Sequence, residues 1–266
     1  EYPVEFDDVW DDDVCELDWP QDVDKECAAG NPILLSDEDR DLVDIAYDQI
    51  ALSIAAYEAS SEVNQYSSKC DAYLAGKVGL TSKERRGLRL FASKAKCANC
   101  HVLEAGPNGE PLLADYTFDN LGIPRNPDNP WYEMYAFNPQ GFDWVDPGLG
   151  GFLETREDYE EHAAENYGKH KVPTLRNVDL RPSPDFVKAF GHNGYFKSLE
   201  GIVHFYSTRD VKLFTTEAAA LKQKCWPEPE VAENLNTDEL GDLGLNKAEE
   251  DALVAFLKTL SDGYAP

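Results

Sequence analysis

The 266 residues carry 51 acidic and 24 basic side chains, a formal net charge of −27 at pH 7. Nucleic acids and anionic membrane surfaces favour basic patches, so this charge argues against both as partners. Hydrophobic residues make up 42% of the chain, which is enough for a sizeable core. No apolar run approaches the ~18 residues that a membrane span needs. The length allows one large domain or two small ones.

The N-terminal third of the chain predicts an arm and one long helix. Residues 1–35 combine aspartate runs with aromatic side chains, and we expect an irregular arm packed on the body because disordered segments contain fewer aromatics. Ser36 and the acidic residues after it indicate a helix N-terminus. Apolar side chains then recur at helical spacing and predict a core-facing stripe: Val43, Ala46, Tyr47, Ile50, Ala51, Ile54 and Tyr57.

Three further helices are predicted from their capping residues. The pattern Thr81-x-x-Glu84 is a capping box, Ser198 precedes an apolar run, and Asn246 precedes the last helix. Residues 106–151 are rich in glycine, proline and aromatics and predict an ordered loop that wraps around the edge of a cofactor. Residues 155–167 predict a short acidic helix. The apolar faces of the first and last of these helices are Leu88, Phe91, Ala92 and Ala95, and Leu253, Phe256, Leu257 and Leu260.

The helix that begins after Thr81 leads into Cys97-Ala98-Asn99-Cys100-His101, the C-x-x-C-H signature of covalent haem c attachment. The two thiols bond the porphyrin vinyl groups and the histidine reaches the iron. A zinc site would need two more ligands at similar spacing, and a thioredoxin-type motif would need a βαβ context. The sequence therefore predicts one haem c. Haem c is attached to exported chains, so we expect a periplasmic or extracellular protein whose N-terminus is processed or trimmed.

Four cysteines remain outside the haem motif: Cys15, Cys27, Cys70 and Cys225. An even number in an exported protein indicates disulfides, and we favour Cys15–Cys27 and Cys70–Cys225 over buried free thiols.

The second axial ligand of the haem iron is not decided by the residues alone. Met134 lies among aromatics, where a methionine more often packs on a ring. His162 and His170 lie in polar surroundings and are expected to face solvent. The turn Gly-His-Asn-Gly brings backbone close to a cofactor. The candidates that stay open are His192, His204 and Tyr206.

Residues 40–266 resemble the C-terminal portion of the di-haem cytochrome c peroxidase/MauG family. The matching stretches run in order through 69–76, 86–91, 97–101, 118–124, 171–178, 192–194 and 253–260. In the peroxidase branch a methionine beyond the turn histidine ligates the haem, and in the MauG branch that position is tyrosine. Here it is Tyr206. The resemblance thus implies His101 and Tyr206 as axial ligands, with His192 near the haem.

Arg176, in the matching stretch 171–178, is expected either to neutralise a haem propionate or to form a structural ion pair. No catalytic residue is assigned.

The expected fold is mainly α: a cytochrome c-type haem domain over residues 80–266 with long irregular loops, and an N-terminal helical extension over residues 1–79. Family members carry an N-terminal domain with its own C-x-x-C-H haem, and residues 1–80 resemble only its end. That peroxide-binding haem is therefore expected on a missing or separate domain. The family's calcium site draws a ligand from the same domain, so calcium is a secondary expectation.

Three functions follow as expectations. The first is an electron-transfer domain, because a six-coordinate iron has no open position. The second is the electron-storing half of a di-haem peroxidase or MauG-like oxidase. The third is a subunit of a haem-stacking filament. The expected partner is a redox protein or a second haem domain, and the acidic charge serves either solubility or steering of a basic partner.

Overall fold

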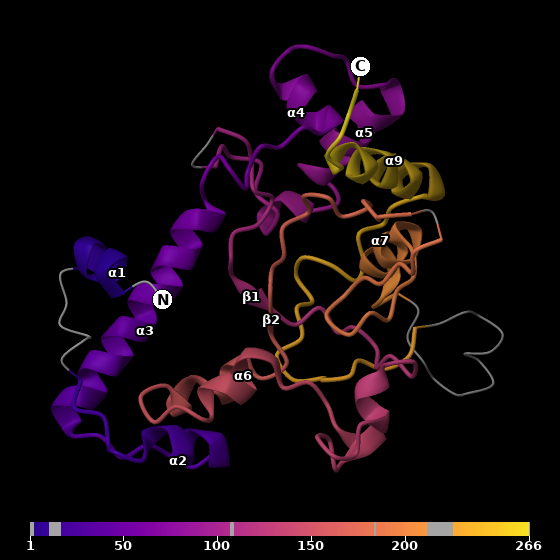
Figure 1. Ribbon diagram of the computed structural model, residues 1–266. Helices are drawn as coiled ribbons and strands as arrows, with labels where there is room; N and C mark the ends of the chain where they lie inside the picture. Colours follow the sequence, from indigo (N-terminus) through magenta and orange to yellow (C-terminus); the bar gives the residue numbers. More distant parts are fainter. Residues whose placement is uncertain (1–2, 11–16, 107–108, 184, 212–225, 266) are drawn as a thin grey trace. The chain divides into compact units, whose positions relative to one another are not determined.

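The computed structural model describes the whole chain except residues 1–2, 11–16, 107–108, 184, 212–225 and 266. The chain divides into two compact units, residues 1–65 and residues 66–266. The described residues are mostly helical, with two short strands, which confirms the mainly α fold class (Figure 1). The expected assignment of domains to residues 1–79 and 80–266 stays a prediction.

The first unit contains helices α1 (Pro3–Trp10), α2 (Val23–Ala29) and α3 (Asp37–Glu58). The expectation of an irregular arm over residues 1–35 is wrong where the structure describes it, because α1 and α2 are helical. Acidic residues in the first turn of α2 favour its N-terminus, and Gly30 closes it in the left-handed conformation at φ 73°. The predicted N-cap of α3 is confirmed, since Ser36 Oγ accepts a hydrogen bond from the Asp39 N–H at 3.1 Å.

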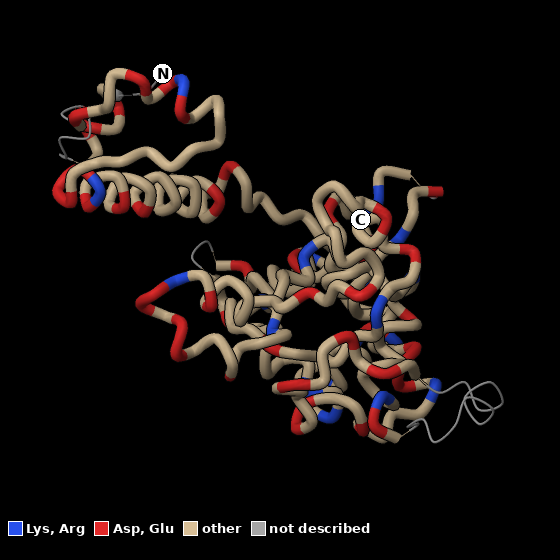
Figure 2. Tube along the Cα trace, turned by 90° about the horizontal axis from the view of Figure 1, so that it is seen from below, with Lys and Arg blue, Asp and Glu red and all other residues tan. Residues whose placement is uncertain are grey.

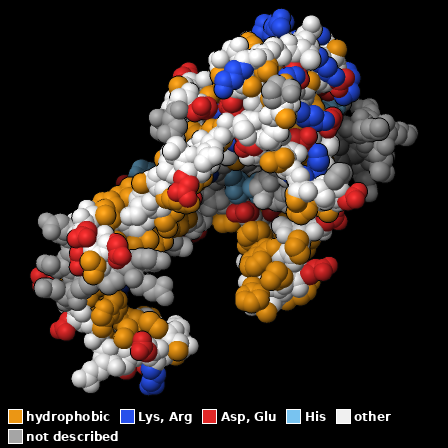
Figure 3. Space-filling model, turned by 45° about the horizontal axis from the view of Figure 1, so that its top comes forward, with side chains coloured by type: hydrophobic (Ala, Val, Ile, Leu, Met, Phe, Trp, Pro, Cys, Tyr) orange, Lys and Arg blue, Asp and Glu red, His pale blue; other side chains and the backbone are white. Residues whose placement is uncertain are grey.

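The predicted burial of the α3 stripe is wrong. Tyr47 is 72% exposed, Ile50 50% and Ile54 55%, and hydrophobic side chains are visible along this helix (Figure 3). An apolar stripe makes a helix face that can be buried, but burial requires a partner surface. The neighbouring helices α1 and α2 have only 8 and 7 residues against the 22 of α3, too few to cover it.

The second unit is built on helices α4 (Lys69–Leu74), α5 (Ser82–Phe91), α7 (Leu199–Thr208) and α9 (Lys247–Leu257). The predicted caps are confirmed. Thr81 and Glu84 form a capping box, Ser198 caps α7, and Asn246 forms a second capping box with Glu249. A 3₁₀ turn, Lys258–Leu260, continues α9.

Helices α5 and α9 pack in direct backbone contact (Figure 1). A Cβ on Gly87 would collide with the carbonyl of Ala252 and with Phe256, so only glycine allows this approach. The rings of Phe91 and Phe256 meet edge to face with centroids 5.2 Å apart. The core extends from this contact to α7 through Phe205, which is fully buried.

The long segment between α5 and α7 contains short regular elements where it is described, and the ordered wrap expected over residues 106–151 stays a prediction. It pairs strand β1 (Phe118–Asp119) with strand β2 (His170–Lys171) in antiparallel register, Asp119 opposite His170. Helix α6 (Gly148–Leu153) and several 3₁₀ turns complete it. The predicted helix over residues 155–167 is wrong, since only the turns Glu160–His162 and Ala164–Asn166 form there. Its dense negative charge opposes a continuous helix.

Acidic positions are distributed along both units and outnumber basic ones (Figure 2). In the part of the chain that the structure describes, no helix is both long and apolar enough to span a membrane.

Candidate haem-binding site

The C-x-x-C-H motif lies just beyond helix α5. The helix ends at Phe91, and Lys96 takes a left-handed conformation at φ 55° before the 3₁₀ turn Cys97–Asn99. The cysteines therefore sit in a separate turn, not at the end of the helix as the sequence predicted. The His101 N–H donates to the Cys97 carbonyl at 2.9 Å, which closes one helical turn over the motif. Both cysteines and the histidine thus share one short, hydrogen-bonded segment.

His101 is held by a backbone bond on one ring nitrogen. Its Nδ1 lies 2.9 Å from the Leu113 carbonyl oxygen, and its ring lies against Phe91 with centroids 6.5 Å apart. Nδ1–H bonding of this kind fixes the tautomer and leaves Nε2 as the ligand atom. Burial lowers the pKa of His101, more strongly than the Leu113 hydrogen bond raises it, so the imidazole is neutral at pH 7.

Tyr206 comes from helix α7 and faces the same motif. Burial is the main cause that raises the pKa of Tyr206, and the nearby Cys97 and Cys100 thiols raise it further. Tyr206 and Cys97 also pack against the same hydrophobic core. The neighbouring Phe205 is fully buried in the core, and this anchors the helix. The C-x-x-C-H segment and Tyr206 of α7 thus pack on one core, and their joint binding of a haem stays a prediction.

Acidic side chains line the Cys100 side of the site. The ligand atoms of Cys100, Asp119 and Glu239 all lie within 4.8 Å of one another. Cys100 Sγ lies 3.6 Å from Glu239 Oε2, and Asn236 Nδ2 donates to Glu239 Oε2 at 3.0 Å. Burial and, as the second cause, the negative charge of Glu239 raise the pKa of Cys100 to about 12. Neither Asp119 nor Glu239 was predicted as a site residue: Glu239 lies in no matching stretch, and the resemblance over 118–124 implied no role for Asp119.

The donor set fits haem c. Burial raises the pKa of Cys97 to about 12, so both thiols are protonated and chemically quiet until they form thioethers. A neutral imidazole and a buried phenol offer nitrogen and oxygen donors of the kinds that ligate haem iron.

The other candidate ligands occupy different environments. Met134 is 43% exposed. His204 Nδ1 lies 2.9 Å from Glu250 Oε1, on the face of α7 toward α9. The side chain of His162 is 51% exposed, as expected, and its Nδ1 lies 3.0 Å from Glu165.

Arg176 is buried in an ion pair. Its side chain is 4% exposed, and its NH1 lies 2.6 Å from Asp71 Oδ1. It also donates to the Pro111 carbonyl and stacks 3.9 Å from the Tyr66 ring centroid. Of the two roles expected for Arg176, the structure describes the ion pair, and the propionate contact stays a prediction.

His192 contacts a carboxylate and a second histidine. Its Nε2 lies 3.2 Å from Glu230 Oε2, and its ring stacks on His170 with centroids 3.8 Å apart. The expectation that His170 faces solvent is wrong. It is partly buried because strand β2 turns it toward His192, and burial lowers the pKa of His170, with His192 lowering it further. The placement of His192 beside the haem stays a prediction.

The cysteines outside the motif are only partly described. Cys27 is exposed and Cys70 is buried. Their expected disulfide partners, Cys15 and Cys225, lie outside the described residues, so both pairings stay predictions.

Known proteins resemble this chain in sequence and in fold. No protein-family model matches the chain. The chain is 33% identical over 223 residues to the methylamine utilization protein MauG of Paracoccus denitrificans, covering 82% of this chain and 52% of that protein. It is 28% identical over 226 residues to the cytochrome-c peroxidase IdrP1 of Denitromonas iodatirespirans, covering 80% of this chain and 50% of that protein.

The fold matches the diheme peroxidase BthA from Burkholderia thailandensis with a TM-score of 0.59 and 26% identity, over 85% of this chain and 53% of that one. The chain spans about half the length of the relatives it matches. By sequence and by fold, it belongs to the family of MauG and di-haem cytochrome c peroxidases.

Proposed function

We propose that this chain holds one haem c through Cys97 and Cys100, with His101 and Tyr206 as axial ligands, and that the haem transfers electrons. The observation that supports this most strongly is that Tyr206 and Cys97 pack against the same hydrophobic core, with the Cys97 and Cys100 thiols among the groups that raise the pKa of Tyr206. A tyrosine ligand stabilises ferric iron, and an iron with both axial positions filled exchanges electrons without binding substrate.

The protein's own residues fix this geometry. The Leu113 carbonyl holds Nδ1 of His101, and so directs Nε2 away from the backbone. Buried Phe205 and Phe256 hold α7 against α9, and so fix the phenol of Tyr206. Haem c supplies one-electron chemistry when it is bound. The acidic surround of Asp119 and Glu239 favours the ferric state, because negative charge stabilises the more positive iron.

A second function is favoured by the relatives. Matching proteins are named as MauG and as a cytochrome-c peroxidase, and the chain spans about half their length. We therefore propose as the alternative that this domain stores electrons for a second haem, on another domain or chain, that meets peroxide. In both versions the protein is exported to the periplasm, and the partner is a redox protein or that second haem domain.

Replacement of the phenol tests the ligand assignment. In the haem-loaded protein, Tyr206→Phe should turn the ferric haem from low-spin to high-spin, or recruit a different ligand, because phenylalanine has no donor atom. The optical and electron paramagnetic resonance spectra report the change. Tyr195→Phe is the matched control, since Tyr195 is also partly buried and packs on Phe196 with centroids 5.0 Å apart. An unchanged spectrum in Tyr206→Phe would remove Tyr206 from the iron.

Addition of peroxide separates the two functions. The electron-transfer version predicts that the isolated ferric domain keeps its spectrum when peroxide is added. The storage version predicts a spectral change that requires a co-purifying second haem. Rapid oxidation of this domain by peroxide, without a second haem, would contradict both.

A further inference from the structure

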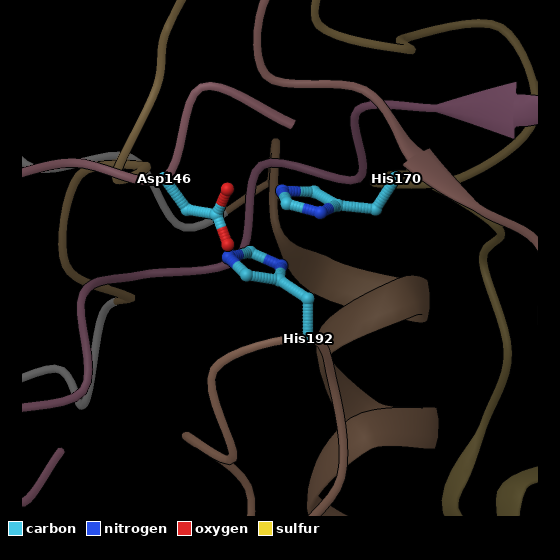
Figure 4. A group of neighbouring side chains, drawn as sticks. All are labelled: Asp146, His170 and His192. Atoms are coloured by element: carbon cyan, nitrogen blue, oxygen red, sulfur yellow. The ribbon is translucent and has the colours of Figure 1, made fainter. Parts of the chain in front are cut away.

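A second group of ligand side chains lies apart from the C-x-x-C-H motif. It consists of Asp146, from the loop before α6, His170, from β2, and His192, from the loop before α7. One ligand atom of each lies within 4.8 Å of those of the other two. The two imidazole rings lie parallel, and both turn a nitrogen toward the Asp146 carboxylate (Figure 4).

A second carboxylate, Glu230, lies beside this group. Its side chain is only 2% exposed, and its Oε2 lies 3.2 Å from Nε2 of His192. Its Oε2 also accepts a hydrogen bond from Asn193 Nδ2 at 2.9 Å. Its Oε1 accepts one from the Tyr132 hydroxyl at 3.2 Å. These bonds fix the carboxylate, so its position beside His192 is built into the fold.

The charge of the group is not balanced by a permanent cation. Glu230 forms an ion pair with His192. Among the described residues, neither Asp146 nor Glu230 pairs with a lysine or arginine. Asp146 and Glu230 therefore bring two carboxylates to one partly buried place. Such charge is costly unless it is paired or coordinates a metal.

The spacing suits a metal ion. Two ligands at the usual ~2.0–2.1 Å from a zinc-sized ion in tetrahedral arrangement stand roughly 3.4 Å apart. The ligand atoms of Asp146, His170 and His192 all lie within 4.8 Å of one another, so small side-chain shifts bring them to that separation.

We propose that Asp146, His170 and His192 bind a divalent transition-metal ion of the zinc and copper class, with Glu230 beside His192 holding its ring in place. Two imidazoles and carboxylates suit Zn²⁺ and Cu²⁺, whereas Ca²⁺ and Mg²⁺ prefer all-oxygen sites. The site joins the loop before α6, strand β2 and the loop before α7, and a bound ion holds these three segments together. It shares no residue with the proposed haem ligands Cys97, Cys100, His101 and Tyr206.

Calorimetric titration of the chelator-treated, haem-loaded protein with Zn²⁺ alone tests the site. Wild type should bind one ion per chain at this site. His170→Phe keeps a flat ring on His192 but removes a ligand, and it should weaken Zn²⁺ affinity by at least about tenfold to a hundredfold. Asp146→Asn should act in the same direction. His162→Phe is the control, since His162 is largely exposed and outside the group, and it should leave the affinity unchanged.

The haem spectrum is recorded for each variant and should match wild type. This shows that the variants are folded and keeps the outcome independent of the haem assignment. Loss of the Zn²⁺ isotherm in both site variants, with His162→Phe unchanged, supports the proposal. An absent isotherm in wild type, or an equal affinity in wild type and both site variants, overturns it.

Discussion

Helices α3 and α9 begin in the same way and end in different environments. Each has a capping side chain at its start and acidic residues in its first turn. Yet Phe256 on α9 is fully buried, whereas Ile50 on α3 is 50% exposed. The difference lies in the neighbouring helices. Helix α5 packs closely on α9 because Gly87 has no side chain, whereas the neighbours of α3 within its unit are short. Capping and periodicity determine that a helix forms, and the partner surface determines what its stripe contributes.

The largest expected effect comes from truncating one apolar side chain on each helix. Phe256→Ala should lower the free energy of unfolding of the second unit by about 3–5 kcal/mol, because it leaves a cavity against Phe91. Ile50→Ala should change stability by less than about 1 kcal/mol, because the side chain is already half in water. Denaturant unfolding measures both. Equal losses at the two positions would mean that the stripe of α3 is buried in solution.

Removal of the caps should have a smaller and more equal effect. Asn246→Ala and Ser36→Ala each remove a side-chain acceptor from a first-turn N–H, at a cost of about 1 kcal/mol to each helix. Amide hydrogen exchange in the first turn of each helix reports the loss locally. Protection that falls in α9 but stays unchanged in α3 would show that Ser36 does not cap its helix.

The smallest expected effect is a pH dependence confined to the capping box of α5. Burial raises the pKa of Glu84, but hydrogen bonds from Lys69 and Thr81 outweigh it and hold the pKa below its usual 4.5. A lowered folded-state pKa adds stability above pH 4.5 that is lost as the pH falls through the folded value. Glu84→Gln keeps a cap acceptor but does not titrate. Below pH 4.5 its free energy of unfolding should therefore fall less with decreasing pH than that of wild type, by a difference of roughly 1 kcal/mol or less. If the free energy of unfolding of Glu84→Gln falls as steeply as that of wild type below pH 4.5, the pH dependence comes from other carboxylates.

The sequence predicted the elements that depend on local chemistry. The caps Ser36, Thr81, Ser198 and Asn246 signal helix starts through hydrogen bonds within one turn, and all four are confirmed. The C-x-x-C-H motif signals its cofactor because attachment needs adjacent residues. Its exact backbone was not predicted, since the left-handed Lys96 that separates it from α5 is not a glycine.

The features that depend on distant segments were missed. Glu239 lies more than a hundred residues from Cys100 and Asp119 in the chain, and neither carboxylate belongs to the C-x-x-C-H motif that it contacts. The stacking of His170 on His192 depends on the β1–β2 register and on the turn before α7. Neither is visible in the residues next to His170, so the sequence predicted that His170 faces solvent. Long-range pairing of loops is the part of this fold that periodicity does not encode.

The intact mass of the purified, acid-denatured protein tests the central claim most directly. Denaturation removes any haem held only by ligands, so a covalent haem c keeps both its Soret band and its mass on the chain. The account predicts the mass of the polypeptide plus one haem, and loss of that increment in a variant with Cys97→Ala and Cys100→Ala. A denatured chain with the mass of the bare polypeptide and no Soret band would contradict it.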